Sequence, residues 1–279
     1  MSNSKTILLI ISATIVLITS CKNNQNGEKP LLESKIITDT VFSKSLNESR
    51  LLSIYLPKGY VQNRTYPVVY SADGQIVVEA YKNEMDSLIA NRILPEFILV
   101  GVHSNEKKIP GVIFEYRNYE YIKGFGNKNT KLGQLYENHY EFFTQEVLKY
   151  VENKYLISKD YNNRIFYGIS NGAGLGVSIG AENPKLFKHY ICFSIAGEDY
   201  KNLNWSDDDY PLYYISYGNK EDESFKKTAE NFDEFLTQNN FNHELSSYDG
   251  GHDRKKWRKE FFNILPRILR KLTLHNNGE

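Results

Sequence analysis

The chain has 279 residues, of which 41% are apolar, and its 34 basic side chains balance its 34 acidic ones. This balance argues against nucleic acid as a partner, because binding to a phosphate backbone needs a local excess of lysine and arginine. A chain of this length and apolar content is sufficient for one large hydrophobic core.

The first twenty residues are typical of a bacterial export signal. A positive start precedes an apolar segment that is too short to span a bilayer comfortably. The segment ends in Ile18-Thr19-Ser20-Cys21, which resembles a lipobox, so Cys21 would be lipidated and become the new N-terminus. The alternative is an ordinary secretory signal in which this cysteine stands by chance.

This N-terminus predicts three parts of the chain. We expect a lipoprotein signal peptide over residues 1–20, a polar tether over 21–32 and one domain over 33–275. The protein would then lie at the bacterial cell envelope, on the periplasmic or outer-membrane face, and the lipid on Cys21 would be its only membrane contact. The other cysteine, Cys192, would have no partner for a disulfide within the mature chain.

Beyond the tether, strand-like and helix-like hydrophobic patterns alternate. The segments 35–42 and 50–56 suggest an opening antiparallel pair. Further strands are expected at 66–71, 97–102, 165–167, 189–196, 212–217 and 243–248. Helices are expected at 80–90, 137–154, 224–238 and 256–272, with another directly after Ser170. The alternation predicts an α/β fold in which helices cover both faces of a mostly parallel sheet.

The pattern breaks down between residues 109 and 140, where aromatic side chains crowd into a glycine-punctuated stretch. This stretch looks like an insertion over the sheet. Two interpretations stay open: a wall that faces the substrate, or a loop held down by its own rings.

Gly168, Ser170 and Gly172 form a complete G-x-S-x-G motif. An apolar strand precedes the motif, and small residues typical of a closely packed helix follow it. Ser170 would therefore sit at a nucleophile elbow, a strand-to-helix corner so tight that the residues two before and two after the serine must be small. The bare motif is weak evidence because glycine and serine are common, and the flanking strand and helix strengthen it.

A nucleophilic serine needs a base, and His252 is the strongest candidate. It follows a glycine pair at the end of a strand, and ligands collect at the carboxyl ends of parallel strands. His103 also follows a strand and is the competitor. The other four histidines lie in a helix, in strands or in the C-terminal tail. No two histidines have the spacing of metal ligands, so neither a metal nor a cofactor is expected.

The loop after the strand 212–217 supplies the acid. Glu221 and Asp222 are neighbours there, so only one can point towards the histidine, and Glu221 is favoured. The other would be a solvated charge at the start of a helix. The oxyanion hole would take one N–H from Asn171, the residue after the nucleophile, and one from the loop Asp73-Gly74-Gln75.

In this order, the pieces resemble the Putative esterase family, which is related to enterochelin esterase, feruloyl and acetyl-xylan esterases and the mycolyltransferases. The resemblance covers about residues 51–272. Its matching segments are Leu56-Pro57-Lys58-Gly59-Tyr60, Asp73-Gly74, Arg117-Asn118-Tyr119-Glu120-Tyr121, the elbow, the loop at Gly218, and Gly250-Gly251-His252-Asp253 with Trp257. The chain departs from the family at Ala173, where a second glycine is usual.

The resemblance implies an α/β-hydrolase fold and a role for each matching residue. These roles are nucleophile for Ser170, base for His252, acid for Glu221, oxyanion donor for Gln75 and Asn171, and substrate contact for Arg117.

The predicted activity is that of a serine hydrolase that cleaves carboxylic esters through an acyl-enzyme. Its substrate would be a siderophore or an acylated or feruloylated polysaccharide. The alternative, of a different class, is a lipoprotein that keeps this fold to bind a siderophore or glycan without turnover, and the full set of serine, acid and histidine argues against it. An aromatic stretch beside Arg117 fits a catecholate, a feruloyl ring or a sugar face equally well, so the sequence does not identify the ester.

Overall fold

The computed structural model describes residues 29–155, 157–197, 200–205 and 209–276. The signal peptide and the lipobox lie outside the described residues, so both stay predictions. Within the described part of the chain, no helix is long and apolar enough to cross a membrane.

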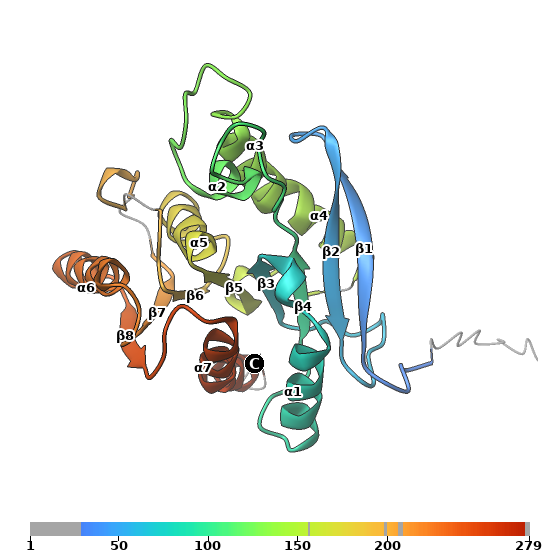
Figure 1. Ribbon diagram of the computed structural model, residues 1–279. Helices are drawn as coiled ribbons and strands as arrows, with labels where there is room; N and C mark the ends of the chain where they lie inside the picture. The colour runs from blue at the N-terminus through green and yellow to red at the C-terminus, as the bar shows by residue number, and fades with distance from the viewer. Residues whose placement is uncertain (1–28, 156, 198–199, 206–208, 277–279) are drawn as a thin grey trace, which may run out of the picture.

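Eight strands form one sheet in the order β1-β2-β4-β3-β5-β6-β7-β8 (Figure 1). β1 pairs with β2, and β2 with β4, in antiparallel fashion, and all the other pairs are parallel. The strands are β1 (Lys35–Ser43), β2 (Glu48–Leu56), β3 (Val68–Ala72), β4 (Ile98–Val102), β5 (Arg164–Ile169), β6 (His189–Phe193), β7 (Leu212–Gly218) and β8 (His243–Tyr248). Every residue of the central strands β3, β4, β5 and β6 is buried, which explains why they are mostly apolar.

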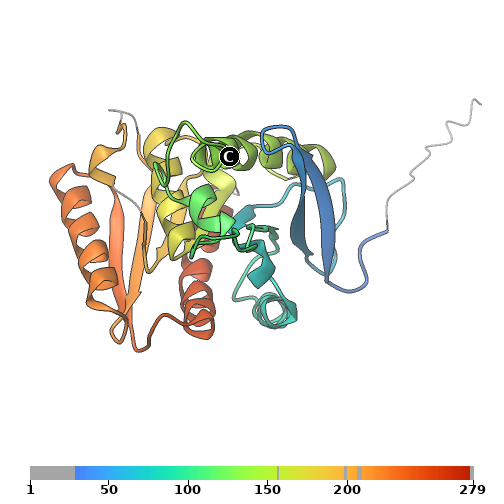
Figure 2. The same cartoon turned by 45° about the horizontal axis from the view of Figure 1, so that its top comes forward.

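Helices cover both faces of this sheet, as Figures 1 and 2 show. α1 (Glu79–Ala90) and α7 (Arg254–Asn276) pack on one face. The opposite face carries α2 (Tyr116–Tyr121), α3 (Leu135–Glu141), α4 (Leu148–Lys154), α5 (Asn171–Glu182) and α6 (Glu223–Gln238). Short helical turns are η1 (Gly74–Ile76), η3 (Tyr161–Asn163) and η4 (Tyr200–Asn202). The predicted α/β-hydrolase fold, with a mostly parallel sheet and helices on both faces, is confirmed.

The helix expected at 137–154 is present and is not regular throughout. A π-helical segment, η2 (Phe142–Val147), joins α3 to α4. Within it, the Thr144 hydroxyl donates to the Tyr140 carbonyl oxygen at 2.7 Å, a back-bond that competes with regular helical bonding.

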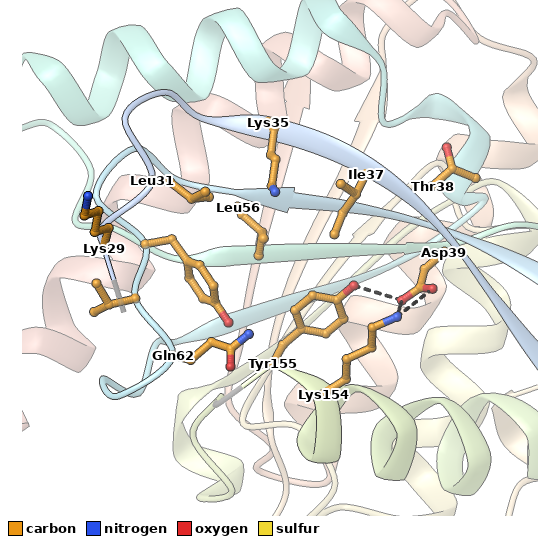
Figure 3. Close-up of a pocket in the computed structure, with 12 residues that line it drawn as sticks. Lys29, Leu31, Lys35, Ile37, Thr38, Asp39, Leu56, Gln62, Lys154 and Tyr155 are labelled. Carbon is orange, nitrogen blue, oxygen red and sulfur yellow. Dashed lines mark hydrogen bonds and ion pairs between the residues drawn. The ribbon is translucent and has the colours of Figure 1, made fainter. Parts of the chain in front are cut away.

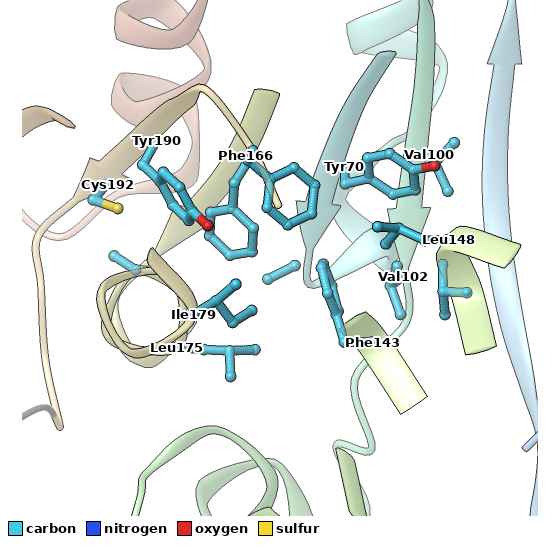
Figure 4. Close-up of a cluster of buried hydrophobic side chains, with 14 of the residues drawn as sticks. Tyr70, Val100, Val102, Phe143, Leu148, Phe166, Leu175, Ile179, Tyr190 and Cys192 are labelled. Atoms are coloured by element: carbon cyan, nitrogen blue, oxygen red, sulfur yellow. The ribbon is translucent and has the colours of Figure 1, made fainter. Parts of the chain in front are cut away.

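The core beneath α5 explains the glycines of that helix (Figure 4). Phe166 of β5 packs against Tyr190 of β6, with ring centroids 5.4 Å apart. A β-carbon on Gly176 would collide with the Phe166 ring, so only glycine lets α5 approach the sheet this closely. Cys192 lies in the same cluster with no exposed surface, and burial raises the pKa of its thiol.

The stretch expected as an insertion carries α2 and the loops on either side of it. Its rings pack on one another, because the Phe125 centroid lies 4.9 Å from that of Phe114 and 4.8 Å from that of Tyr119. Tyr121 is buried in the main core. The interpretation as a loop held down by its own rings therefore describes these side chains, although Ile113 in the same stretch is 90% exposed.

Candidate active site

Ser170 occupies the corner between β5 and α5. Its backbone has φ 55° and ψ −127°, a strained conformation for a residue with a side chain, and such conformations concentrate at functional sites. A β-carbon on Gly168 would collide with the backbone of Gly172, and one on Gly172 would come within 3.0 Å of an Asp73 carboxylate oxygen. The small residues predicted on both sides of the serine are therefore required by the close approach of these segments.

Glu221 lies just beyond β7, and its side chain has no exposed surface. Its Oε1 is 3.3 Å from Nδ1 of His252 and accepts hydrogen bonds from the Ser194 hydroxyl at 2.6 Å and the Tyr248 hydroxyl at 3.0 Å. Burial by itself would raise the pKa of Glu221. The bonds from His252, Ser194 and Tyr248 outweigh burial, so the pKa lies below its usual value and the carboxylate is charged at neutral pH.

The neighbouring carboxylate has a different partner. Asp222 caps the start of α6, where its Oδ1 accepts from the Ser224 amide at 2.9 Å and from the Ser224 hydroxyl at 2.6 Å. Of the two candidates for the acid, the structure brings Glu221, and not Asp222, to His252.

His252 follows β8 and is held between two aromatic rings. Its ring centroid lies 4.4 Å from that of Phe225 and 4.5 Å from that of Trp257, and the Trp257 contact is edge to face. His252 lines the same cavity as Ser170. The competitor His103 is bonded to Ser53, with Nε2 2.8 Å from the hydroxyl oxygen, and lines a different hollow. Burial lowers the pKa of His103.

Ser194 and Tyr248 are parts of the site that the sequence analysis missed. Ser194 follows β6, is fully buried and has a positive φ of 52°. Its Oγ accepts the indole N–H of Trp257 at 2.9 Å and donates to Glu221, which forms a chain of hydrogen bonds. Tyr248 ends the strand expected at 243–248, so attention to hydroxyl groups at strand ends would have found it. Ser194 lies inside the strand expected at 189–196, because β6 ends one residue before it, at Phe193.

The two predicted oxyanion donors begin helical turns. Asn171 is the first residue of α5, and Gln75 lies in η1, so neither backbone N–H has a partner within its own helix. The side chain of Gln75 is engaged elsewhere. Its Nε2 donates to the Ser104 hydroxyl at 2.7 Å and to Glu106 at 2.8 Å, which leaves the backbone N–H as the group that could serve an oxyanion.

Arg117, the predicted substrate contact, lines the cavity but already has a partner. Its Nε and Nη2 donate to the two carboxylate oxygens of Asp73 at 2.6 and 2.7 Å. The guanidinium also lies over the ring of Tyr121, 4.9 Å from the centroid. Contact of Arg117 with a substrate stays a prediction.

Of the predicted site residues, Ser170, His252 and Arg117 line a cavity of about 270 Å³ at the carboxyl ends of the parallel strands, whereas Glu221, Asn171 and Gln75 do not. It is lined by Asp73, Glu106, Glu115, Arg117, Ile169, Ser170, His252, Arg254 and Trp257. Among the described residues, no group of three or more His, Cys, Asp or Glu could hold a metal ion.

A larger hollow of about 520 Å³ lies at the opposite edge of the sheet, between the start of β1 and the end of α4 (Figure 3). Asp39 within it is bonded by Lys154 at 2.7 Å and by the Tyr155 hydroxyl at 2.8 Å. None of the predicted site residues lines this hollow.

Comparison with known proteins shows the family of the chain. The family model described as "Putative esterase" matches residues 43–268. An uncharacterized protein of Bacillus subtilis is 22% identical over 242 residues, which are 82% of this chain and 95% of the relative.

The fold is shared with solved structures, of which two are described. A ferulic acid esterase has a TM-score of 0.68 and 22% identity, over 86% of this chain and 99% of its own. An IroE-like serine hydrolase from Shewanella oneidensis has a TM-score of 0.67 and 17% identity, over 85% of this chain and 80% of its own. The chain therefore belongs to the Putative esterase family and is a carboxylic ester hydrolase.

Proposed function

We propose that the protein hydrolyses esters through an acyl-enzyme on Ser170, with His252 as the base and Glu221 as the acid. One observation carries this proposal: the strained serine and the histidine line one cavity, and a buried, charged carboxylate lies 3.3 Å from the far nitrogen of that histidine. Nucleophile, base and orienting acid in this relation are the arrangement by which a serine hydroxyl is activated.

The steps follow from the positions of these groups. Nε2 of His252 takes the proton as the Ser170 hydroxyl attacks the ester carbonyl, and the charge on Glu221 stabilises the imidazolium that forms. The N–H groups of Gln75 and Asn171 stabilise the oxyanion of the tetrahedral intermediate. His252 then returns the proton to the departing alcohol, and water releases the acyl group by the same route.

We propose an acylated or feruloylated polysaccharide, or a siderophore, as the source of the ester. The solved structure named a ferulic acid esterase supports a feruloyl ester, and the siderophore rests on the resemblance of the sequence to enterochelin esterase. The cavity of about 270 Å³ is small, so it would hold the ester group while most of a larger carrier molecule stays outside.

The substitution Ser170→Ala tests the activity. Purified wild type should hydrolyse p-nitrophenyl acetate, and at least one of feruloyl esters, acetylated xylan and a catecholate trilactone, whereas the variant should lose several orders of magnitude in kcat. A fluorophosphonate probe should label only the wild type. Tight binding of one of these compounds without any turnover by the wild type would favour the binding lipoprotein instead.

We also propose that the protein is anchored to the cell envelope by a lipid on Cys21. Support comes from the lipobox-like sequence alone. Cys21→Ser should abolish labelling by a fatty-acid analogue and release the protein from the membrane fraction. A variant that still pellets with membranes and still takes up the label would refute the anchor.

A further inference from the structure

The loop that supplies the first oxyanion donor is short and is held in a strained shape. Asp73 precedes η1 with a positive φ of 57° and is almost fully buried. On one side, Gly74 packs so closely on Gly101 of β4 that neither position has room for a β-carbon. A loop in this conformation persists only where its surroundings hold it there.

Helix α2 supplies the contacts that hold the loop. Arg117 donates to both carboxylate oxygens of Asp73, and the Asp73 amide donates to the Tyr121 hydroxyl at 3.1 Å. The backbone and the side chain of Asp73 are thus both fixed by one helix. The pKa of Arg117 is raised: burial alone would lower it, and the charge of Asp73 more than offsets that effect.

The same guanidinium reaches the nucleophile elbow. Arg117 Nη2 lies 3.5 Å from the carbonyl oxygen of Ile169, the residue before Ser170, and the Asp73 carboxylate lies against Gly172. The Arg117–Asp73 pair therefore lies between the two segments that carry the proposed oxyanion donors.

Helix α2 is itself tied to the sheet. Glu120, one turn beyond Arg117, has no exposed surface and forms a bidentate ion pair with Arg50 of β2. Its Oε2 also accepts the Asn105 amide at 3.3 Å, and the Asn105 carbonyl accepts the Arg117 amide at 2.8 Å. These bonds set the position from which Arg117 reaches Asp73.

We propose that Arg117 is a positioning residue, which acts through Asp73 to hold the N–H groups of Gln75 and Asn171 at the spacing that an oxyanion requires. This inference rests on the proposed function. Bidentate hydrogen bonds between an arginine and a carboxylate fix the relative orientation of the two groups, so lysine cannot replace arginine fully here. Loss of the pair would loosen the oxyanion hole while the nucleophile, base and acid remain in place.

The test measures kcat and KM for p-nitrophenyl acetate in Arg117→Met and Arg117→Lys. Displacement of a catalytic group by about 1 Å costs about a hundredfold in rate, so kcat of Arg117→Met should fall by about that factor. KM should stay within about threefold, because the oxyanion exists only in the transition state. Arg117→Lys keeps the positive charge beside Asp73 but cannot make both hydrogen bonds in the arginine geometry. Its kcat should therefore be about tenfold higher than that of Arg117→Met.

Arg164→Met is the matched control. Arg164 is also a largely buried arginine in an ion pair, with Glu152 at 2.5 Å, but it begins β5, whereas Ser170 follows the other end of that strand. The two methionine variants should lose similar thermal stability, and only Arg117→Met should lose kcat. If Arg117→Met does not fold, the comparison of Arg117→Lys with Arg164→Lys decides in the same way.

Two results would overturn the inference. A rise in KM with unchanged kcat would mean that Arg117 binds the substrate directly, and a loss of kcat no larger than that of the control would mean a purely structural role. Ser170→Ala in the same assay separates this failure from failure of the proposed function. If the wild type has no turnover that depends on Ser170, both the proposed function and the inference are refuted. If turnover depends on Ser170 but Arg117→Met keeps the wild-type kcat, only the inference is refuted.

Discussion

Replacing Glu221 with glutamine removes one charge and almost nothing else. The side chains of His252, Ser194 and Tyr248 all approach Oε1, and Oε2 is buried with no hydrogen-bond partner among the described residues. A glutamine can therefore place its carbonyl oxygen at the Oε1 position and its amide nitrogen at the Oε2 position. The tautomer of His252 would be kept, and only the stabilisation of the imidazolium would be lost.

The size of that loss follows from the distance. Coulomb's law at 3.3 Å, with an effective dielectric constant of about 20, gives about 5 kcal/mol between Glu221 and a charged His252. His252 is 36% exposed, so water screens part of this, and about 3–4 kcal/mol is the expected loss. Glu221→Gln should therefore lower kcat by about a hundredfold to a thousandfold.

The assay is the initial rate of p-nitrophenyl acetate hydrolysis at pH 7–8, with Asp222→Asn as the matched control. Asparagine caps a helix as well as aspartate does, so this control should keep both the helix start and kcat. A larger loss in Asp222→Asn than in Glu221→Gln would refute the reasoning and transfer the acid role. Near-normal rates in both would place the orienting group elsewhere, and the exposed Asp249, which pairs with Lys220 at 2.8 Å, would be tested next.

Three further substitutions test other parts of the structure. Gly168→Ala should lower Tm by about 5 °C or more or prevent folding, because the added methyl collides with the start of α5, whereas Gly251→Ala, which has 3.6 Å of clearance, should leave Tm unchanged in the same melting experiment. Trp257→Phe keeps a ring against His252 but removes the N–H bonded to Ser194, so kcat should fall by up to about tenfold at constant KM, and a change in KM alone would refute this. His139 is buried, with a pKa lowered to about 3 by burial and by a nearby arginine, so it stays neutral when folded but charges when unfolded below pH 6.5. Stability should therefore fall by up to about 1.4 kcal/mol per pH unit from pH 6.5 down to about 3, and His139→Phe should reduce this acid dependence in urea titrations at pH 7 and pH 4.5.

The regular part of the fold was predictable because each central strand is buried on both faces and is therefore a mostly apolar run. The order of Ser170, Glu221 and His252 was predictable for a related reason. Each follows a parallel strand, and the carboxyl ends of parallel strands meet at one edge of the sheet.

Helix α2 was not predictable, because its six residues are too few to be stable alone. Its position depends on the ion pairs Arg117–Asp73 and Glu120–Arg50, whose partners lie 44 and 70 residues away in the chain. Ser194 escaped notice for a similar reason. Its role depends on a positive φ and on bonds to residues far away in the sequence, and neither leaves a local pattern.

The burial of Cys192 makes this protein a convenient background for spectroscopic labelling. A thiol with no exposed surface and a raised pKa reacts very slowly with maleimides, so a variant that begins at Lys29 would carry no reactive cysteine. Ile113→Cys would then place one dye at a 90% exposed position on the same chain segment as Glu115 and Arg117 of the cavity. Changes in the fluorescence of that dye would report, in real time, how this segment responds to an added ester.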